Sequence, residues 1–374
     1  MRKHKHIHMK KAVPVNVRSS NGIVLALEER GFGVYQTEDG KVFCIQSRDI
    51  SELAKKTKNA VISWIDYLVD DVQVDMPKVA TAFGFQESLI RPLLKEPRSG
   101  YEDIGTEMGI LIPAITAEGF EVKLNPLFIL INENTILTLH TTEVKRFFRL
   151  RRYAESMIKK IPQNILQADR RTLLLLRILD ENNTRNFNHL LEIEEHGDKL
   201  SAQLADTASS RKVLGSQIYR MKHALVTYLS GLWATVDALN SIRYGDADLL
   251  TDDPHILNRI TGLISEVHSH ISLAEHLSEV LASGMEVLQS LYNNQLQILN
   301  NRLSLLVAYL TIIGTALLVP NTIGTILGPP FSWSEWDVDW YTALIIVSTI
   351  LSTLISWLVI KKLGLLPKSA EEVE

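Results

Sequence analysis

Two long runs without a charged side chain lie near the C-terminal end of the sequence, and they limit which folds the chain can adopt. The first covers 32 residues, from Leu303 to Ser334, and the second covers 21, from Trp340 to Ile360. A helix needs about 20 apolar residues to cross the hydrocarbon core of a bilayer. The sequence therefore predicts a membrane hairpin. A buried hairpin in a large soluble core is the less favoured alternative.

The charges that flank these runs predict the orientation of the hairpin. Arg302 precedes the first run, and Lys361 and Lys362 follow the second, whereas the loop between the runs is acidic and has no lysine or arginine. Basic flanks stay on the cytoplasmic side of a membrane. We therefore expect a multi-pass protein of the cell (inner or cytoplasmic) membrane, with both termini in the cytosol.

Composition and motifs exclude several classes of protein. The formal net charge of −4 argues against a nucleic-acid partner, and a charged fraction of 22% argues against a disordered chain. The single cysteine, Cys44, excludes an intrachain disulfide and a cysteine metal cluster. No nucleotide-binding glycine loop, nucleophile elbow or His-Glu-x-x-His motif occurs. We therefore expect neither an enzyme nor a resident cofactor.

The segment before the hairpin reads as a mixed α/β domain followed by long helices. An Asp39-Gly40 turn predicts a hairpin, and the pattern between residues 68 and 105 is helical. Residues 164–243 also read as helical, with Asn182-Asn183 and Gly197 as weak points. Further strands are expected at 61–68, 108–116, 121–122, 128–132 and 136–140.

One long helix is predicted to enter the membrane. It begins at Asp253-Pro254 and can run for 66 residues, because the next proline is Pro320. The expected fold class is an α+β cytosolic domain with a long helical stalk and two C-terminal transmembrane helices. The predicted division is 1–165 cytosolic α/β domain, 166–302 helical region and stalk, 303–327 first transmembrane helix, 328–339 extracytoplasmic loop, 340–360 second transmembrane helix and 361–374 cytosolic tail.

A stripe of polar and small residues follows this helix into the first apolar run. Its members are spaced alternately by four and three residues, which places them on one face of a helix. They are Asn293, Gln297, Asn300, Ser304, Val307, Thr311, Gly314, Leu318 and, near the outer end of the span, Asn321. Amides and hydroxyls on such a stripe suit a water-filled pore. A contact between membrane helices uses small residues in the same way, so both readings stay open.

The chain resembles the CorA family of pentameric divalent-cation channels. Trp64-Ile65-Asp66, Phe83-Gly84-Phe85 and Leu310-Thr311-Ile312-Ile313 are similar to segments of that family, in the same order. The resemblance implies a CorA-like homopentameric funnel in a lipid bilayer, with divalent cations as substrate and as regulator. The Gly-Met-Asn motif of the family falls on Gly328-Pro329-Pro330, which keeps only the glycine.

Because this motif is lost, other groups at the pore mouth become the candidates for attracting cations. The expected mouth comprises Gly328, Pro329, Pro330, Glu335, Asp337 and Asp339. A ring of carboxylates there would raise the local concentration of cations. A simple solvated loop is the alternative.

Cytosolic metal sensing is a second role that the resemblance implies. Candidate ligands on the long helix are Glu266, His268, His270, Glu275 and Glu279. Mixed histidine and carboxylate ligands suit Zn²⁺, Co²⁺ or Ni²⁺ better than Mg²⁺. An ordinary solvated helix face explains the same residues. The expected function is a membrane-potential-driven divalent-cation channel of the Mg²⁺ class; the alternatives are a non-conducting sensor or scaffold, or a Zn²⁺-selective relative.

Overall fold

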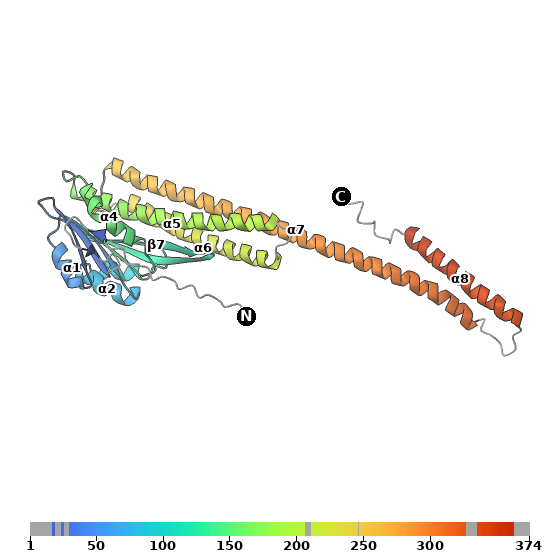
Figure 1. Ribbon diagram of the computed structural model, residues 1–374. Helices are drawn as coiled ribbons and strands as arrows, with labels where there is room; N and C mark the ends of the chain where they lie inside the picture. Colours follow the sequence, from blue (N-terminus) through green and yellow to red (C-terminus); the bar gives the residue numbers. More distant parts are fainter. Residues whose placement is uncertain are drawn as a thin grey trace. The chain divides into compact units, whose positions relative to one another are not determined.

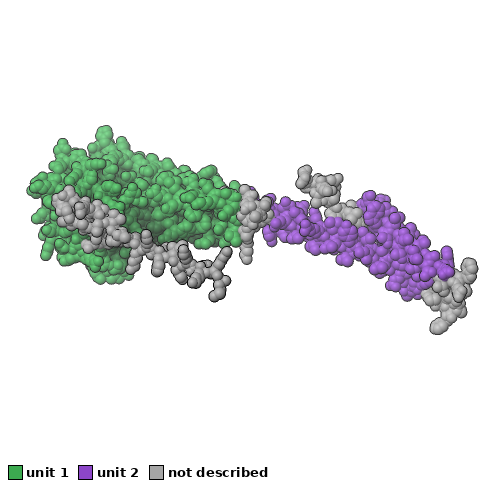
Figure 2. Space-filling model, in the orientation of Figure 1, with its two compact units in different colours: residues 1–285 green, residues 286–374 purple. Residues whose placement is uncertain are grey.

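The computed structural model describes residues 17–18, 24–25, 30–205, 211–245, 247–326 and 335–362. The chain divides into two compact units, residues 1–285 and 286–374, which Figure 2 colours separately. The first unit holds a mixed sheet with helices on both of its faces, and the second holds apolar helices (Figure 1). This is the mixed α/β fold with long helices that the sequence predicts.

The sheet of the first unit has seven strands in the order β4-β3-β5-β9-β8-β7-β6. β5 and β9 pair in parallel, and the other neighbours pair antiparallel. Every residue of β5 and β9 is buried, because helices cover both faces of the sheet there. The strands are β3 (Gly31–Gln36), β4 (Val42–Ser47), β5 (Ile62–Leu68), β6 (Gly100–Asp103), β7 (Met108–Glu118), β8 (Glu121–Ile131) and β9 (Thr135–His140); β1 (Val17–Arg18) and β2 (Val24–Leu25) form a separate pair.

The predicted hairpin around Asp39-Gly40 is confirmed as β3 and β4, with Gly40 at a φ of 78°. Two expectations were wrong. Residues 100–103, in the segment expected to be helical, form strand β6, and β8 is one strand where two were expected. Pro126 of β8 lies opposite Pro113 of β7, beyond the residues that pair with β6 or β9. The sheet is two strands wide at this point, so the prolines interrupt no third strand.

Helices α1 to α3 cover one face of the sheet and α4 to α6 the other (Figure 1). On the first face, Leu53, Met76 and Leu89 pack against sheet residues such as Ile65 and Phe128 in one buried cluster. The helices are α1 (Ile50–Thr57), α2 (Val72–Ala82), α3 (Glu87–Leu93), α4 (Phe147–Lys159), α5 (Gln167–Ala205) and α6 (Arg211–Tyr244).

The predicted weak points of α5 are packing sites in an unbroken helix. Asn182 and Asn183 are both 1% exposed, and the Asn182 Nδ2 donates to the Pro113 carbonyl at 3.2 Å. A Cβ on Gly197 would lie 2.6 Å from the Met221 Cε of α6. Poor helix formers are therefore used where a strand or another helix comes close.

Helix α7 (Pro254–Ile326) has 73 residues and begins as predicted, with Asp253 accepting from the His255 N–H at 2.8 Å. Its length is about 110 Å at 1.5 Å per residue. The helix continues through Pro320, beyond the 66 residues that precede this proline, and ends at Ile326, one residue before the predicted end of the first span. Helix α8 (Glu335–Lys362) contains the second predicted span.

A buried ion pair joins β5 to α4. The side chains of Asp66 and Arg151 are fully buried, and the Arg151 Nε donates to Asp66 Oδ2 at 2.7 Å. Asp66 Oδ1 accepts from the Thr138 hydroxyl at 2.7 Å and lies 3.0 Å from His140 Nε2. Burial alone would raise the pKa of Asp66, but Arg151 and His140 outweigh it and hold this pKa well below the usual range.

Asp66→Asn should therefore destabilise the protein, because it leaves Arg151 buried without a counter-ion. We expect a loss of about 3–5 kcal/mol in the free energy of unfolding at neutral pH. The lowered pKa means that ionised Asp66 stabilises the fold above its unfolded pKa of about 3.9, and that this contribution is lost as the pH falls. As the pH is lowered, the free energy of unfolding of the variant should therefore fall less steeply than that of the parent.

Urea unfolding of the full chain at a series of acidic and neutral pH values measures both effects. Glu38→Gln removes an exposed acid and is the matched control, with an expected change within about 0.5 kcal/mol. An Asp66→Asn protein as stable as its parent at neutral pH would contradict the role given to this ion pair.

Candidate pore-lining helix

Two helices contain stretches long and apolar enough to cross a membrane, α7 and, at residues 339–359, α8. Within the second unit, side chains of α8 contact backbone carbonyls of α7. The Tyr341 hydroxyl donates to the Gly324 carbonyl at 3.1 Å, and the Ser352 hydroxyl lies 3.4 Å from the Ala316 carbonyl. Ala316 and Ser352 are both buried by this contact, at 9% and 7% exposed. One face of α7 is therefore covered by α8.

The polar stripe of α7 lies on an uncovered face. All of its predicted members are exposed in the chain, including the apolar Val307 and Leu318 at 61% and 66%. Gly314 and Ala316 are two residues apart, which puts them about 200° apart around the helix. A Cβ built on Gly314 meets nothing within 4 Å. The stripe thus faces away from α8 and is free to line a pore or to meet another helix.

Threonine hydroxyls along α7 are satisfied by the helix itself. The hydroxyl of Thr311 donates to the Val307 carbonyl at 2.8 Å, and that of Thr325 donates to the Asn321 carbonyl at 2.7 Å. This bonding uses the only hydroxyl hydrogen and leaves oxygen lone pairs as acceptors. Such a threonine needs no partner in hydrocarbon, yet it can accept from the water around a cation.

Pro320 leaves the carbonyl of Ala316 without its usual donor in the helix. A residue with an N–H at position 320 would donate to the carbonyl of Ala316, four residues earlier, and proline cannot. The Ser352 hydroxyl of α8 lies 3.4 Å from this carbonyl and 3.1 Å from the Thr349 carbonyl of its own helix, so its single hydrogen is shared between two acceptors. A proline inside a membrane helix is tolerated where a neighbouring side chain satisfies the freed carbonyl. Helix α7 continues past Pro320 to Ile326.

Ser352→Ala should weaken the packing of α8 on α7 by about 1 kcal/mol, because the Ala316 carbonyl then loses the hydroxyl that lies 3.4 Å from it. In a Pro320→Ala background the restored N–H pairs with that carbonyl, so the same substitution should cost clearly less. Equilibrium unfolding of the purified protein in mixed detergent micelles measures the four proteins of this cycle.

Ser348→Ala is the control for this cycle, because the hydroxyls of Ser348 and Ser352 both bond their own helix, at 2.9 and 3.1 Å, but among the described residues only that of Ser352 also approaches α7. Its cost should be the same in both backgrounds. An equal cost of Ser352→Ala in the two backgrounds would show that Ser352 does not compensate for Pro320.

The predicted pore mouth lies mainly outside the described residues. Gly328, Pro329 and Pro330 belong to the segment 327–334, which the structure does not describe. Glu335 and Asp337 are in the first turn of α8, and Asp339, also on α8, is exposed. The roles given to these groups stay predictions.

The five sensor candidates on α7 are not brought together within one chain. His270 is 5% exposed and stacks on Phe187 of α5, with ring centroids 4.3 Å apart. Burial lowers the pKa of His270, which favours the neutral ring. His268 packs edge-on against Trp233 of α6, and Glu266, Glu275 and Glu279 are exposed. Among the described residues, no group of three metal-ligating side chains can hold an ion.

Sequence reasoning missed a buried polar cluster around Arg146, the residue before α4. Its Nη1 donates to Asn182 Oδ1 and Asn186 Oδ1, both at 2.6 Å, and to the Asn182 carbonyl at 3.1 Å. Its Nη2 donates to the Ile115 carbonyl of β7. The Tyr228 hydroxyl of α6 closes the cluster by donating to the Asn186 carbonyl at 2.8 Å. Asparagines spaced by four on one helix were the only sequence signal for it.

A large mixed α/β domain and two apolar C-terminal helices in one chain define a membrane protein with a soluble domain. The chain belongs to the family of CorA-like Mg²⁺ transporter proteins, whose pattern matches residues 59–362. Members of this family are channels and transporters and not enzymes. The family resemblance and the fold class predicted from the sequence are thereby confirmed.

Solved structures share the fold. The complete structure of the CorA magnesium transporter from Methanocaldococcus jannaschii has a TM-score of 0.65 and 19% identity, over 88% of this chain and 97% of that chain. The full-length CmaX protein has a TM-score of 0.58 and 17% identity, over 90% of this chain and 99% of that chain. A comparison with curated protein sequences gives no match.

Proposed function

We propose that this protein is a homopentameric channel for divalent cations of the Mg²⁺ class, with the polar stripe of α7 around its axis. The single observation that carries the proposal is that this stripe stays uncovered while α8 packs on the opposite face of α7. Family membership supports it, because the matched residues include both candidate spans.

The stripe offers groups that suit a hydrated ion. In a pentamer each stripe position becomes a ring of five, so Asn300 would supply a ring of amides and Thr311 a ring of hydroxyl oxygens. Mg²⁺ gives up its waters reluctantly, and it is usually bound through several of them. Amide and hydroxyl rings can hold such an ion loosely enough for it to leave.

The membrane potential is the proposed driving force, because the chain has no nucleotide-binding motif. Moving a divalent cation inward through 100 mV is favourable by about 4.6 kcal/mol, twice the value for a single charge. No energy source beyond the potential is then needed for uptake.

A non-conducting sensor or scaffold is the second candidate, and the sequence Gly328-Pro329-Pro330 favours it. Proline has neither the amide nor the thioether side chain of the residues it replaces, and only its carbonyl can face an ion. A Zn²⁺-selective relative is the third candidate, because histidine and carboxylate side chains such as His268 and Glu266 on α7 are ligand types that Zn²⁺ takes.

The pentamer is a prediction of the uncovered stripe. A polar face on an apolar helix is costly against lipid, so several copies should turn it toward a common axis. Native mass spectrometry of the detergent-purified protein should give five times the chain mass of 42.2 kDa. A monomer or a dimer would contradict the proposed assembly.

We propose that the basic residues flanking the two spans lie in the cytosol, and this determines the orientation of the hairpin. A cysteine introduced at Ser334, in the acidic loop, should then react with a membrane-impermeant thiol reagent in intact cells. Labelling only after cell lysis would reverse the proposed orientation.

Gly314→Leu tests whether the stripe lines a conducting pore. Five leucines at one level would make a hydrophobic constriction, which tends to lose its water, and cation flux should fall at least about tenfold. A larger side chain meets open space within the chain, so folding is not expected to suffer. Uptake of Mg²⁺, Co²⁺, Ni²⁺ and Zn²⁺ into proteoliposomes measures the effect and identifies the ion.

Ala343→Leu is the matched control, because Ala343 is an exposed residue of α8 and lies off the stripe. It should conduct like the parent. Ala316 is unsuitable as a control, since it is buried against α8. Equal flux in the parent and in Gly314→Leu would show that Gly314 does not line the pore. A parent protein that transports none of the four ions would favour the scaffold.

A further inference from the structure

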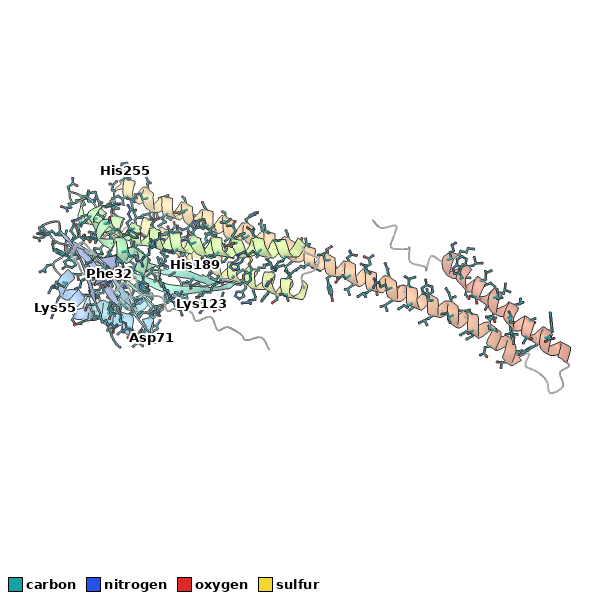
Figure 3. All side chains as sticks on the ribbon, viewed as in Figure 1. Phe32, Lys55, Asp71, Lys123, His189 and His255 are labelled. Carbon is teal, nitrogen blue, oxygen red and sulfur yellow. The ribbon has the colours of Figure 1, made fainter. Side chains whose placement is uncertain are left out.

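A cavity of about 660 Å³ lies in the first unit, where the β7–β8 hairpin, the segment before α4 and helix α5 meet. Figure 3 labels two of its lining residues, Lys123 on β8 and His189 on α5. Pockets for small molecules typically measure about 300–1,000 Å³ and carry a few placed polar groups. This cavity has that size, and the transport proposal makes no use of it.

The wall of this cavity contains a buried guanidinium without a counter-ion. Arg146 is 6% exposed, and no carboxylate among the described residues lies within ion-pair distance of it. Burial, and then the nearby charge of Arg185, lowers the pKa of Arg146 to about 9, so the group is still charged at neutral pH. A buried charge with only neutral partners is costly, and an anion in the cavity would offset that cost.

Arg146 also has hydrogen-bond donors to spare. Its four hydrogen bonds, to Asn182, Asn186 and Ile115, use both Nη1 hydrogens and one on Nη2. None of the hydrogen bonds of Arg146 to the described residues uses its Nε–H or its second Nη2–H. Two adjacent N–H groups on one guanidinium match two oxygens of a phosphate or carboxylate.

The charges of the cavity are arranged by depth. Arg146 is buried and Arg185 half-buried, whereas the carboxylates of Glu118, Glu121 and Glu143 are all on exposed residues. Arg185 is paired with Glu181 at 3.2 Å, but Lys145, at the mouth, has no ion pair among the described residues. Charges act more strongly where water is excluded, so the deeper positive groups determine what the cavity attracts.

We propose that this cavity binds a small soluble anion that carries phosphate groups, held by the guanidinium of Arg146 at the wall and by the ammonium of Lys145 at the mouth. A phosphate presents paired oxygens to the planar fork of an arginine and further oxygens to a lysine point charge. Carboxylates at the mouth exclude a larger, uniformly acidic partner by repulsion.

Isothermal titration of the full-length protein in detergent tests the site, with pyrophosphate and ATP as separate probes. EDTA is included so that a divalent cation cannot bridge either probe to the mouth carboxylates. Lys145→Glu reverses the charge of an exposed residue, and it should weaken binding at least about tenfold by removing a charge-assisted contact. Arg146→Lys keeps the charge but loses the fork, and it should weaken binding as well.

Lys222→Glu is the matched control, because Lys222 is an exposed residue of α6 that does not line the cavity. It should bind the probes like the parent. Binding of either probe that depends on Lys145 and not on Lys222 supports the site. Absence of binding to the folded parent at millimolar probe, or binding that Lys145→Glu leaves unchanged, overturns it.

Discussion

The backbone hydrogen bonds of α7 are the constraint on which the membrane part of this protein depends. In hydrocarbon every N–H and carbonyl must be satisfied within the protein, so a spanning segment must be a continuous helix. Pro320 opens one gap in that helix, at the carbonyl of Ala316. The Ser352 hydroxyl of α8 lies 3.4 Å from this carbonyl, on the face of α7 that α8 covers, and Gly314 lies on the open face. The missing N–H of Pro320 and the contact with α8 thus fall on the same face of α7.

The sequence predicted those parts of the fold whose signal is local. Two charge-free runs, an Asp-Gly turn and an Asp-Pro helix start each depend on a few adjacent residues, and each was confirmed. The contact of Ser352 with the Ala316 carbonyl was not predicted, because the two residues lie on different helices. Asn182 and Gly197 were read as weak points for the same reason, since their partners lie on β7 and α6.

In the candidate site, too, the sequence predicted only what depends on neighbouring residues. The alternation of four and three residues made the stripe visible in the sequence, and exposure of all its members agrees with a common face. A single chain does not separate a pore from a helix contact, because both need a face without intrachain partners. The sequence predicted His270 as a metal ligand, but in the structure its ring stacks on Phe187 of α5. Arg146 gave no signal, since its burial depends on β7 and α5 coming together.

Selectivity in a channel without Gly-Met-Asn has to arise from fixed dipoles and not from net charge. Acidic residues at an outer mouth attract every cation in proportion to its charge, and salt screens them over about 10 Å at 0.1 M. They therefore raise the local concentration of cations but do not distinguish Mg²⁺ from Ca²⁺ or Zn²⁺. Discrimination needs oxygens at set positions around the axis, which proline carbonyls, amides and hydroxyls supply. In this chain the stripe carries three amides before the first span, at Asn293, Gln297 and Asn300, and a fourth at Asn321 near the other end of that span, so a conducting pore would have amide oxygens at both of its ends.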